Sequence, residues 1–135
     1  MKLGLLVLLL FPLFATAQLE LSIYVEGVKT NSGYINVAVY NQADGFLQHD
    51  KVYKSGHTRA VKGVTHIFID NLPEGEYALA VFHDENGNNE LDTNWLGIPR
   101  EAYGFSKGKV KLLGPPSFFE CAMQISADSE IRIIL

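Results

Sequence analysis

Hydrophobic and polar residues alternate along much of the chain with a period of two, which is the pattern of β-strands that have one face in water. Six segments are predicted to be strands: residues 19–26, 34–40, 60–70, 77–82, 119–125 and 131–135. The turn cluster at residues 30–33 predicts that the first two strands pair as a hairpin. The fourth segment is apolar on both faces, as expected of a central strand.

The connections between these segments are rich in turn residues. A tight turn is predicted at residues 71–75, where Pro73 presets φ and Gly75 accepts a positive φ. Residues 41–58 are polar and predict a long connection or a short irregular helix. No segment has the 3.6-residue apolar stripe of a helix over ten or more residues. The pattern therefore predicts an all-β domain, an antiparallel β-sandwich of about seven strands, immunoglobulin-like or prealbumin-like.

Residues 1–17 are predicted to be a cleavable signal peptide rather than part of the domain. Lys2 precedes an apolar run at residues 3–14, and the next three residues fit the small-x-small pattern before a cleavage point. A membrane anchor or an N-terminal core helix is the alternative, but the run is shorter than the roughly 20 residues that span a bilayer. Cleavage before Gln18 would leave residues 18–135 as one sandwich domain, periplasmic or secreted, with no transmembrane segment predicted in the mature chain.

Composition and charge narrow the classes of function. Hydrophobic residues make up 47% of the 135 residues and charged residues 19%, which is a globular composition. The net charge is -4, and the Lys and Arg residues are scattered rather than gathered in the basic stripe that nucleic-acid binding needs. Cys121 is the one cysteine, so no internal disulfide can form in an oxidising compartment. Stability must come from the core or from a bound ion.

The segment 83–92 is the strongest candidate for chemistry. It carries four carboxylates with no Lys or Arg, and oxygen-bearing side chains recur at alternate positions. A curled loop presents alternate side chains to one centre, and Ca²⁺ takes about six to eight oxygen ligands. The sequence thus predicts a calcium site with these ligands: Asp84, Asn86, Asn88, the backbone carbonyl of Glu90, and Asp92.

The segment departs from a helical calcium-binding loop at two positions. Counted from Asp84, position six is Asn89 in place of Gly, although Asn tolerates the left-handed conformation. Position twelve is Trp95 in place of a bidentate Glu, so a sixth ligand would come from Asn94, Glu101 or water. The alternative interpretation is a solvated hairpin tip that binds no metal.

Aromatic and glycine residues are concentrated in the next segment, residues 95–106. Trp95, Tyr103 and Phe105 either fold back to seal the end of the sandwich or form a surface that binds a protein or a glycan. Aromatic side chains are the usual anchors of such surfaces, and they are also common packing residues. Both interpretations stay open at this point.

Catalytic motifs find little support. Residues 104–108 match the G-x-S-x-G pattern, but that motif needs a strand-turn-helix and a later His, and no His follows Ser106. The four His residues lack paired spacing for zinc. Cys121 lies on the inward face of a predicted strand, where a structural thiol is expected. A small hydrolase that uses the clustered carboxylates is only a third hypothesis.

Three segments resemble a known family: residues 33–41 are GYINVAVYN, residues 71–78 are NLPEGEYA, and residues 96–106 are LGIPREAYGFS. With the signal peptide and the 83–92 loop, they resemble the bacterial secreted family named domain of unknown function 2141, over essentially the whole mature chain. The resemblance implies a compact β-sandwich exported by Gram-negative bacteria, and it implies no activity. The Leu-Pro-x-Gly-x-Tyr turn also resembles prealbumin-like and carboxypeptidase-regulatory-like sandwiches, at the level of fold alone.

The leading hypothesis of function is a secreted, non-enzymatic binding or structural module of unknown partner, with loop 84–92 ordered by Ca²⁺. The alternative is a metal-free module that contacts a protein or a glycan through the aromatic loop 95–106. The metal content of the purified protein would separate the two.

Overall fold

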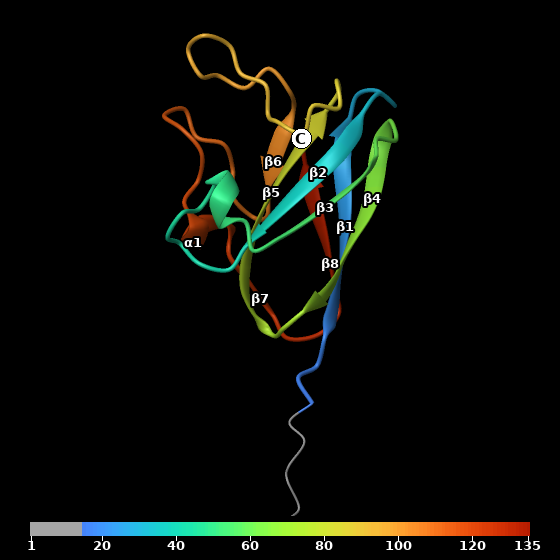
Figure 1. Ribbon diagram of the computed structural model, residues 1–135, viewed down its shortest axis with the longest axis vertical. Helices are drawn as coiled ribbons and strands as arrows, with labels where there is room; N and C mark the ends of the chain where they lie inside the picture. The colour runs from blue at the N-terminus through green and yellow to red at the C-terminus, as the bar shows by residue number, and fades with distance from the viewer. Residues whose placement is uncertain (1–14) are drawn as a thin grey trace, which may run out of the picture.

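The computed structural model describes residues 15–135, so the predicted signal peptide lies outside the described residues apart from residues 15–17, which are exposed. The elements in chain order are β1 (Leu19–Val28), β2 (Tyr34–Tyr40), η1 (His49–Lys51), β3 (Lys54–Arg59), β4 (Gly63–Leu72), β5 (Gly75–Asp84), β6 (Tyr103–Phe105), α1 (Phe118–Cys121), β7 (Met123–Ile125) and β8 (Ser129–Ile134) (Figure 1). In this part of the chain, no helix has the length and apolar character needed to cross a membrane.

Two sheets pack face to face as a sandwich, with strand orders β4-β1-β8 and β3-β2-β5-β6, and β7 pairs with β5 (Figure 1). Among the described strands, every pairing is antiparallel except that of β1 with β8, where Leu21 lies opposite Ser129 in parallel register. β8 is parallel because it enters the sheet from the end of the sandwich where β1 begins. The prediction of an all-β, antiparallel sandwich is confirmed apart from the parallel β1–β8 pair, with eight strands in place of about seven.

The predicted hairpin of the first two strands is wrong. β1 pairs with β4 and β8, whereas β2 pairs with β3 and β5 in the other sheet. Residues 29–33 carry the chain across the sandwich rather than back along one sheet. The polar segment 41–58 contains a short irregular helix, η1, and also the edge strand β3. Because the residues of β3 are mostly polar, hydrophobic alternation does not mark it.

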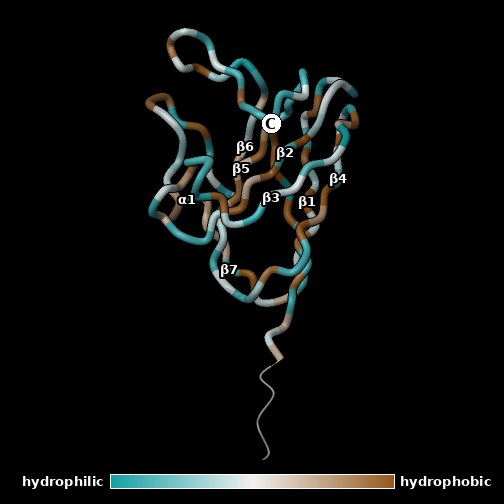
Figure 2. The backbone as a smooth tube through the Cα atoms, in the orientation of Figure 1, coloured by the Kyte–Doolittle hydropathy of each residue, from teal (hydrophilic) through white to brown (hydrophobic). Residues whose placement is uncertain are grey.

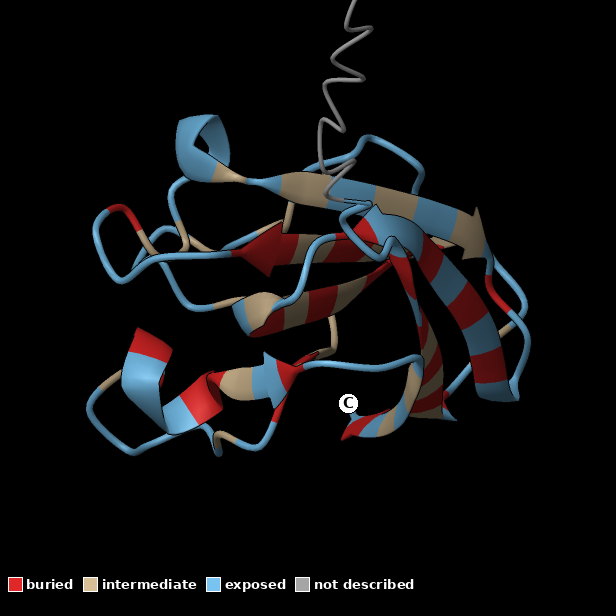
Figure 3. Ribbon diagram, turned by 90° about the horizontal axis from the view of Figure 1, so that it is seen from below, coloured by how far each residue is buried: buried red, intermediate tan, exposed pale blue. Residues whose placement is uncertain are grey.

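The core fills the space between the two sheets. The inward residues of β1 and β2 are buried there, and β5 contributes Leu79 to the same cluster. The other face of β5 is covered as well, because Ala78 packs in a second cluster with Tyr40, Phe118 and Cys121. The expectation that this strand is apolar on both faces is therefore confirmed. Figure 2 shows the hydrophobic residues along the strands, and Figure 3 shows how buried and exposed residues alternate.

Residues 119–125 form no continuous strand, contrary to the prediction. The first part is the helical turn α1, and β7 follows it. Ser117 and Glu120 form a capping box, in which the Ser117 N–H donates to Glu120 Oε2 at 2.7 Å. Cys121 is buried, as a structural thiol would be, but it lies on α1 rather than on a strand. Burial raises the pKa of its thiol.

Candidate functional site

The candidate calcium loop begins where β5 ends, at Asp84, whose side chain is fully buried. Its Oδ1 accepts hydrogen bonds from the backbone N–H groups of Gly87 at 2.8 Å and Asn88 at 3.1 Å. Its Oδ2 accepts the N–H of Asn89 at 2.8 Å and the side-chain N–H of Asn36, on β2, at 3.3 Å. Asp84 therefore organises the backbone of the loop.

Two residues of the loop have left-handed backbone conformations that let the chain curl back. Gly87 has a φ of 75° and Asn89 a φ of 62°. Glycine has no Cβ to clash there, and Asn is enriched among the non-glycine residues that adopt this region. Asn89, at position six of the loop, thus adopts the left-handed conformation that an Asn tolerates.

The side chains of the loop converge on Asp92. The Asn86 Nδ2 donates to Asp92 Oδ2 at 2.6 Å, and the Asn88 Nδ2 donates to Asp92 Oδ1 at 2.9 Å. The side-chain oxygens of the two Asn residues accept backbone N–H groups at Asn88 and Glu90. Four predicted ligands, Asp84 among them, are thus linked in one hydrogen-bonded network. Glu90 enters it through its N–H, and its side chain is exposed.

Glu101, which follows Trp95 in the chain, accepts hydrogen bonds from both ends of the loop. Its Oε1 accepts the N–H of Glu85 at 3.0 Å, and its Oε2 accepts the N–H of Asp92 at 3.1 Å. Of the two side chains considered as a sixth ligand, Glu101 therefore contacts the loop. The Asn94 side chain instead accepts hydrogen bonds within the next turn.

The donor set suits a hard cation, because the candidate side chains offer oxygen ligands. A carboxamide oxygen has two lone pairs, so Asn86 and Asn88 can each accept a backbone N–H and still face a cation. Residues 15–135 contain no cluster of three or more His, Cys, Asp or Glu side chains that could hold a metal. Of the five ligands predicted first, Asp84 and Asp92 provide the side chains of those types, so a site here would depend on amide and backbone oxygens as well.

His83 lies one residue before the loop, with its ring fully buried. Its Nε2 lies 2.7 Å from the Ser32 carbonyl oxygen, so Nε2 donates and Nδ1 carries no proton in the neutral ring. The Nδ1 atom has no hydrogen-bond partner within the described chain and lies 3.8 Å from Glu85 Oε1. His83 therefore anchors the start of the loop to the connection between β1 and β2.

The three aromatic residues predicted to contact a partner have different environments. Trp95 is 89% exposed on a turn, so it does not seal the end of the sandwich. Tyr103 and Phe105 lie on β6 with their ring centroids 5.9 Å apart, and Phe105 packs against the second core cluster. Trp95 is therefore exposed as a contact with a partner would require, whereas Phe105 packs against the fold.

Ser106, from the G-x-S-x-G segment, has a structural position. Its hydroxyl accepts the Leu79 N–H at 2.9 Å and donates to the Cys121 carbonyl oxygen at 2.8 Å, and both bonds are buried. These bonds link β5 to α1. The segment leaves β6 through a bend rather than entering a helix, so the strand-turn-helix context of a nucleophile is not formed there.

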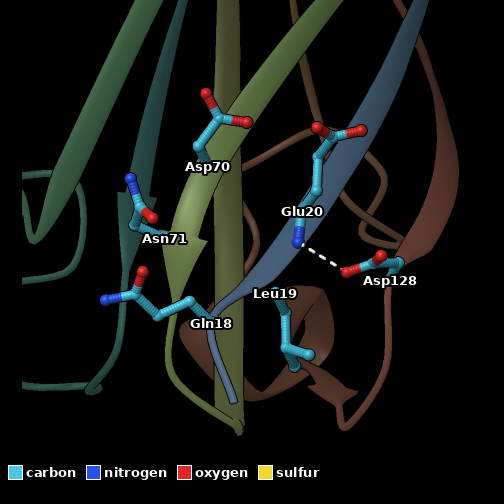
Figure 4. Close-up of a pocket in the computed structure, with 6 residues that line it drawn as sticks. All are labelled: Gln18, Leu19, Glu20, Asp70, Asn71 and Asp128. Carbon is cyan, nitrogen blue, oxygen red and sulfur yellow. Dashed lines mark hydrogen bonds between the residues drawn. The ribbon is translucent and has the colours of Figure 1, made fainter. Parts of the chain in front are cut away.

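A second group of carboxylates lines a hollow of about 350 Å³ at the end of the sandwich where β1 begins (Figure 4). Glu20, Asp70 and Asp128 reach it from β1, β4 and the turn before β8, and Gln18 also lines it. The Asp128 Oδ1 accepts the Glu20 N–H at 2.8 Å. No sequence pattern marks this group, because its acidic residues are far apart along the chain.

Comparison with known proteins identifies the family of the chain but does not indicate an activity. Residues 23–133 match the family described as "Uncharacterized protein conserved in bacteria (DUF2141)". No curated protein and no solved structure matches the chain. The resemblance noted in the sequence is therefore confirmed over nearly the whole domain.

Proposed function

The chain belongs to the DUF2141 family of uncharacterized bacterial proteins, and from the geometry of its loop we propose an exported, non-enzymatic binding or structural module that is ordered by calcium. The proposed site is the loop that follows β5. Its ligands are the side chains of Asp84, Asn86, Asn88 and Asp92 and the backbone carbonyl of Glu90.

The observation that carries the proposal is the convergence of the Asn86 and Asn88 side chains on both oxygens of Asp92. Two amide N–H donors face this carboxylate, which is where a cation would also be attracted. A cation beside Asp92 would displace these N–H groups. Each Asn oxygen accepts one backbone N–H, from Asn88 or from Glu90, and has a second lone pair that can face the cation.

Binding would require Asp84 to exchange one of its contacts. Its four hydrogen bonds use both carboxylate oxygens, and the longest is the 3.3 Å bond from Asn36. A cation would replace this bond at the lowest cost. It would also offset the mutual repulsion of the four carboxylates that lie between residues 84 and 92 without a Lys or Arg.

Thermal unfolding tests the calcium site directly. Extracellular calcium modules bind with a Kd on the order of 10⁻⁴–10⁻³ M. At ten times Kd, binding to the folded state stabilises it by about 1.4 kcal/mol, which raises Tm by several degrees in a domain of this size. The mature protein is expected to have a higher Tm in millimolar CaCl₂ than in EDTA, and MgCl₂ is expected to have a smaller effect because Mg²⁺ demands near-octahedral geometry.

Asp92→Asn is the diagnostic variant, because Asp84 is buried and its loss would destabilise the loop with or without a metal. The variant loses one of the two acceptors in an exposed network, so its Tm in EDTA is expected to fall by only a few degrees, and most of the calcium shift is expected to be lost. Asn41→Ala, an exposed substitution outside the loop, should keep the shift. Equal Tm values of the unaltered protein in EDTA and calcium, with no heat of binding in calorimetry, would contradict the calcium site.

Export is supported by the start of the fold. β1 begins at Leu19 and the residues before it are exposed, so cleavage after Ala17 would remove no strand residue. Gln18 lines the hollow of Figure 4 together with Glu20, Asp70 and Asp128, so its new amino group would lie at the same end of the sandwich as these opposite charges. Expression of the full chain in a Gram-negative host is expected to yield a periplasmic or secreted species that begins at Gln18. A mature pool that retains residues 1–17 would contradict cleavage.

The exposure of Trp95 favours a second candidate function, a metal-free module that contacts a protein or a glycan. The contact would centre on Trp95, because Tyr103 and Phe105 are partly covered by the fold. Chelation separates the two candidates. A contact made by Trp95 alone persists in EDTA, whereas a function that needs the ordered calcium loop is lost.

A further inference from the structure

Two loops of the molecule end in turns that hold apolar side chains in water. The first tip, residues 93–99, is closed by a bridge between Thr93 and Pro99, and the Asn94 N–H donates to the Ile98 carbonyl oxygen at 2.8 Å. Its apolar side chains are exposed by the following fractions: Trp95 89%, Leu96 60% and Ile98 55%. The backbone hydrogen bonds of the tip hold these side chains in their outward positions.

The second tip, residues 111–114, is a tight turn in which Lys111 and Gly114 exchange backbone hydrogen bonds at 3.1 Å and 3.3 Å. Leu112 and Leu113, at its end, are each 99% exposed. Both tips extend to the left of β6 in the view of Figure 1, and Figure 2 shows that both are hydrophobic at their ends. A turn can be made from polar residues, so apolar side chains at both tips point to an interaction surface.

Charge near the second tip indicates the chemistry of the partner. Residues 102–119 contain Lys107, Lys109 and Lys111 and no acidic residue, although the whole chain has a net charge of -4. Lys111 pairs with the Glu120 carboxylate at 2.6 Å, and the Lys107 ammonium donates to the Ala122 carbonyl oxygen at 3.0 Å, so Lys109 is the lysine of this segment that is best placed to meet an anionic group. Basic side chains beside an apolar tip are complementary to anionic headgroups that cover a hydrocarbon layer.

We propose that the two tips dock the protein on a bilayer surface that contains anionic phospholipid. Trp95 and the two leucines enter the headgroup region, where such side chains are favoured. The Lys109 ammonium stays at the phosphates while its stem lies along the apolar layer. A bilayer accepts separate narrow projections without a complementary pocket, whereas a protein partner would have to provide a pocket for each tip.

The docking surface does not depend on the calcium site, but the two are adjacent. The Asp92 carbonyl accepts the Arg100 N–H at 2.8 Å across the base of the first tip. The carboxylates of the neighbouring loop repel anionic headgroups. A bound divalent cation would reduce this repulsion, so docking is expected to be stronger in calcium than in EDTA.

Vesicle binding of the mature protein tests the proposal. Trp95 is the only tryptophan of the chain, so its fluorescence reports on the first tip alone. Vesicles of phosphatidylethanolamine and phosphatidylglycerol are expected to shift its emission to shorter wavelength and to co-sediment with the protein. Vesicles of phosphatidylcholine are expected to bind more weakly, and added salt should weaken binding to the anionic vesicles.

Paired variants test the second tip. Leu112→Ser combined with Leu113→Ser is expected to weaken vesicle affinity by about tenfold or more, because two side chains no longer leave water. Lys109→Glu should also weaken binding to anionic vesicles. Val64→Thr, on β4 and outside both tips, removes exposed apolar surface without changing side-chain shape, and it should leave the affinity unchanged.

The outcomes separate docking from calcium binding. Binding that persists in EDTA and strengthens in calcium supports docking, whereas binding that occurs only in calcium overturns a docking surface that acts without the metal; the melting experiment tests the calcium site separately. Absence of co-sedimentation and of an emission shift in both buffers overturns the docking surface, whatever the melting experiment shows. Self-association that depends on Leu112 and Leu113, without vesicle binding, would overturn it in favour of a second copy of the chain.

Discussion

The two ends of β5 are held by different kinds of interaction. At its start, the turn from β4 closes within a few residues, Asn71 has a φ of 57°, and the Tyr77 hydroxyl donates to the Pro73 carbonyl oxygen at 2.7 Å. At its end, Asp84 accepts three backbone N–H groups of the loop and Glu101 accepts two. Backbone geometry and packing close the first end, and carboxylates hold the second.

The difference follows from the length of the connection. A tight turn satisfies its polar groups with neighbouring residues, whereas the long segment after β5 has backbone N–H groups with few strand partners. Carboxylates are strong acceptors for such groups, but they also make the segment responsive to charge and to cations. We therefore expect charge substitutions and calcium to act on the second end of β5 and to leave the first unchanged.

The largest expected effect is that of Asp84→Ala. Three N–H groups lose a buried, charged acceptor, so the free energy of unfolding is expected to fall by about 3 kcal/mol. Urea denaturation measures the loss. Asp44→Ala, at an exposed position, should change stability by no more than about 0.5 kcal/mol. Equal stability of the two variants would contradict the conclusion that the Asp84 carboxylate holds the second end of β5.

A smaller effect is expected for Glu101→Gln. The amide keeps one oxygen acceptor of two, so the two ends of the loop are joined less firmly, at a cost of about 1 kcal/mol. Hydrogen exchange should become faster at the Glu85 and Asp92 amides. Glu74→Gln makes the same chemical change in the turn at the start of β5 and should leave exchange there unaltered. Matching exchange rates in both variants would contradict the assigned role of Glu101.

The smallest expected effect concerns Glu120, an exposed carboxylate outside both ends of β5. Hydrogen bonds from Lys111 and then from the Ser117 N–H and hydroxyl lower the pKa of Glu120 from 4.5 to about 2. Because the folded pKa lies below the ordinary value, this carboxylate stabilises the protein above about pH 4.5, and its contribution is lost as the pH falls towards 2.

Glu120→Gln is therefore expected to lower Tm by no more than about 2 °C at pH 7, with the difference shrinking to nothing near pH 2. Thermal unfolding across this pH range measures the difference. A difference between variant and unaltered protein that widens on acidification would show that the sign is wrong.

The local sequence pattern predicts most of the strands and the residues that make up the loop after β5. Leu21 and Ile35 lie inward because alternation specifies the face of a strand, which is a property of neighbouring residues. The spacing of Asp84, Asn86, Asn88 and Asp92 likewise placed them in one loop. Local pattern does not predict the turn α1, although Ser117 and Glu120 have the spacing of a capping box, because residues 119–125 alternate as a strand would.

Tertiary structure alone decided the rest. Alternation does not encode which strand is the partner, so the separation of β1 from β2 and the parallel entry of β8 follow only from packing the whole chain. The same holds for Asn36, which reaches Asp84 because β2 pairs with β5, and for the choice of Glu101 over Asn94. The sequence does not distinguish Trp95 from Phe105. The fold exposes Trp95 and partly covers Phe105, because burial depends on elements distant in the sequence.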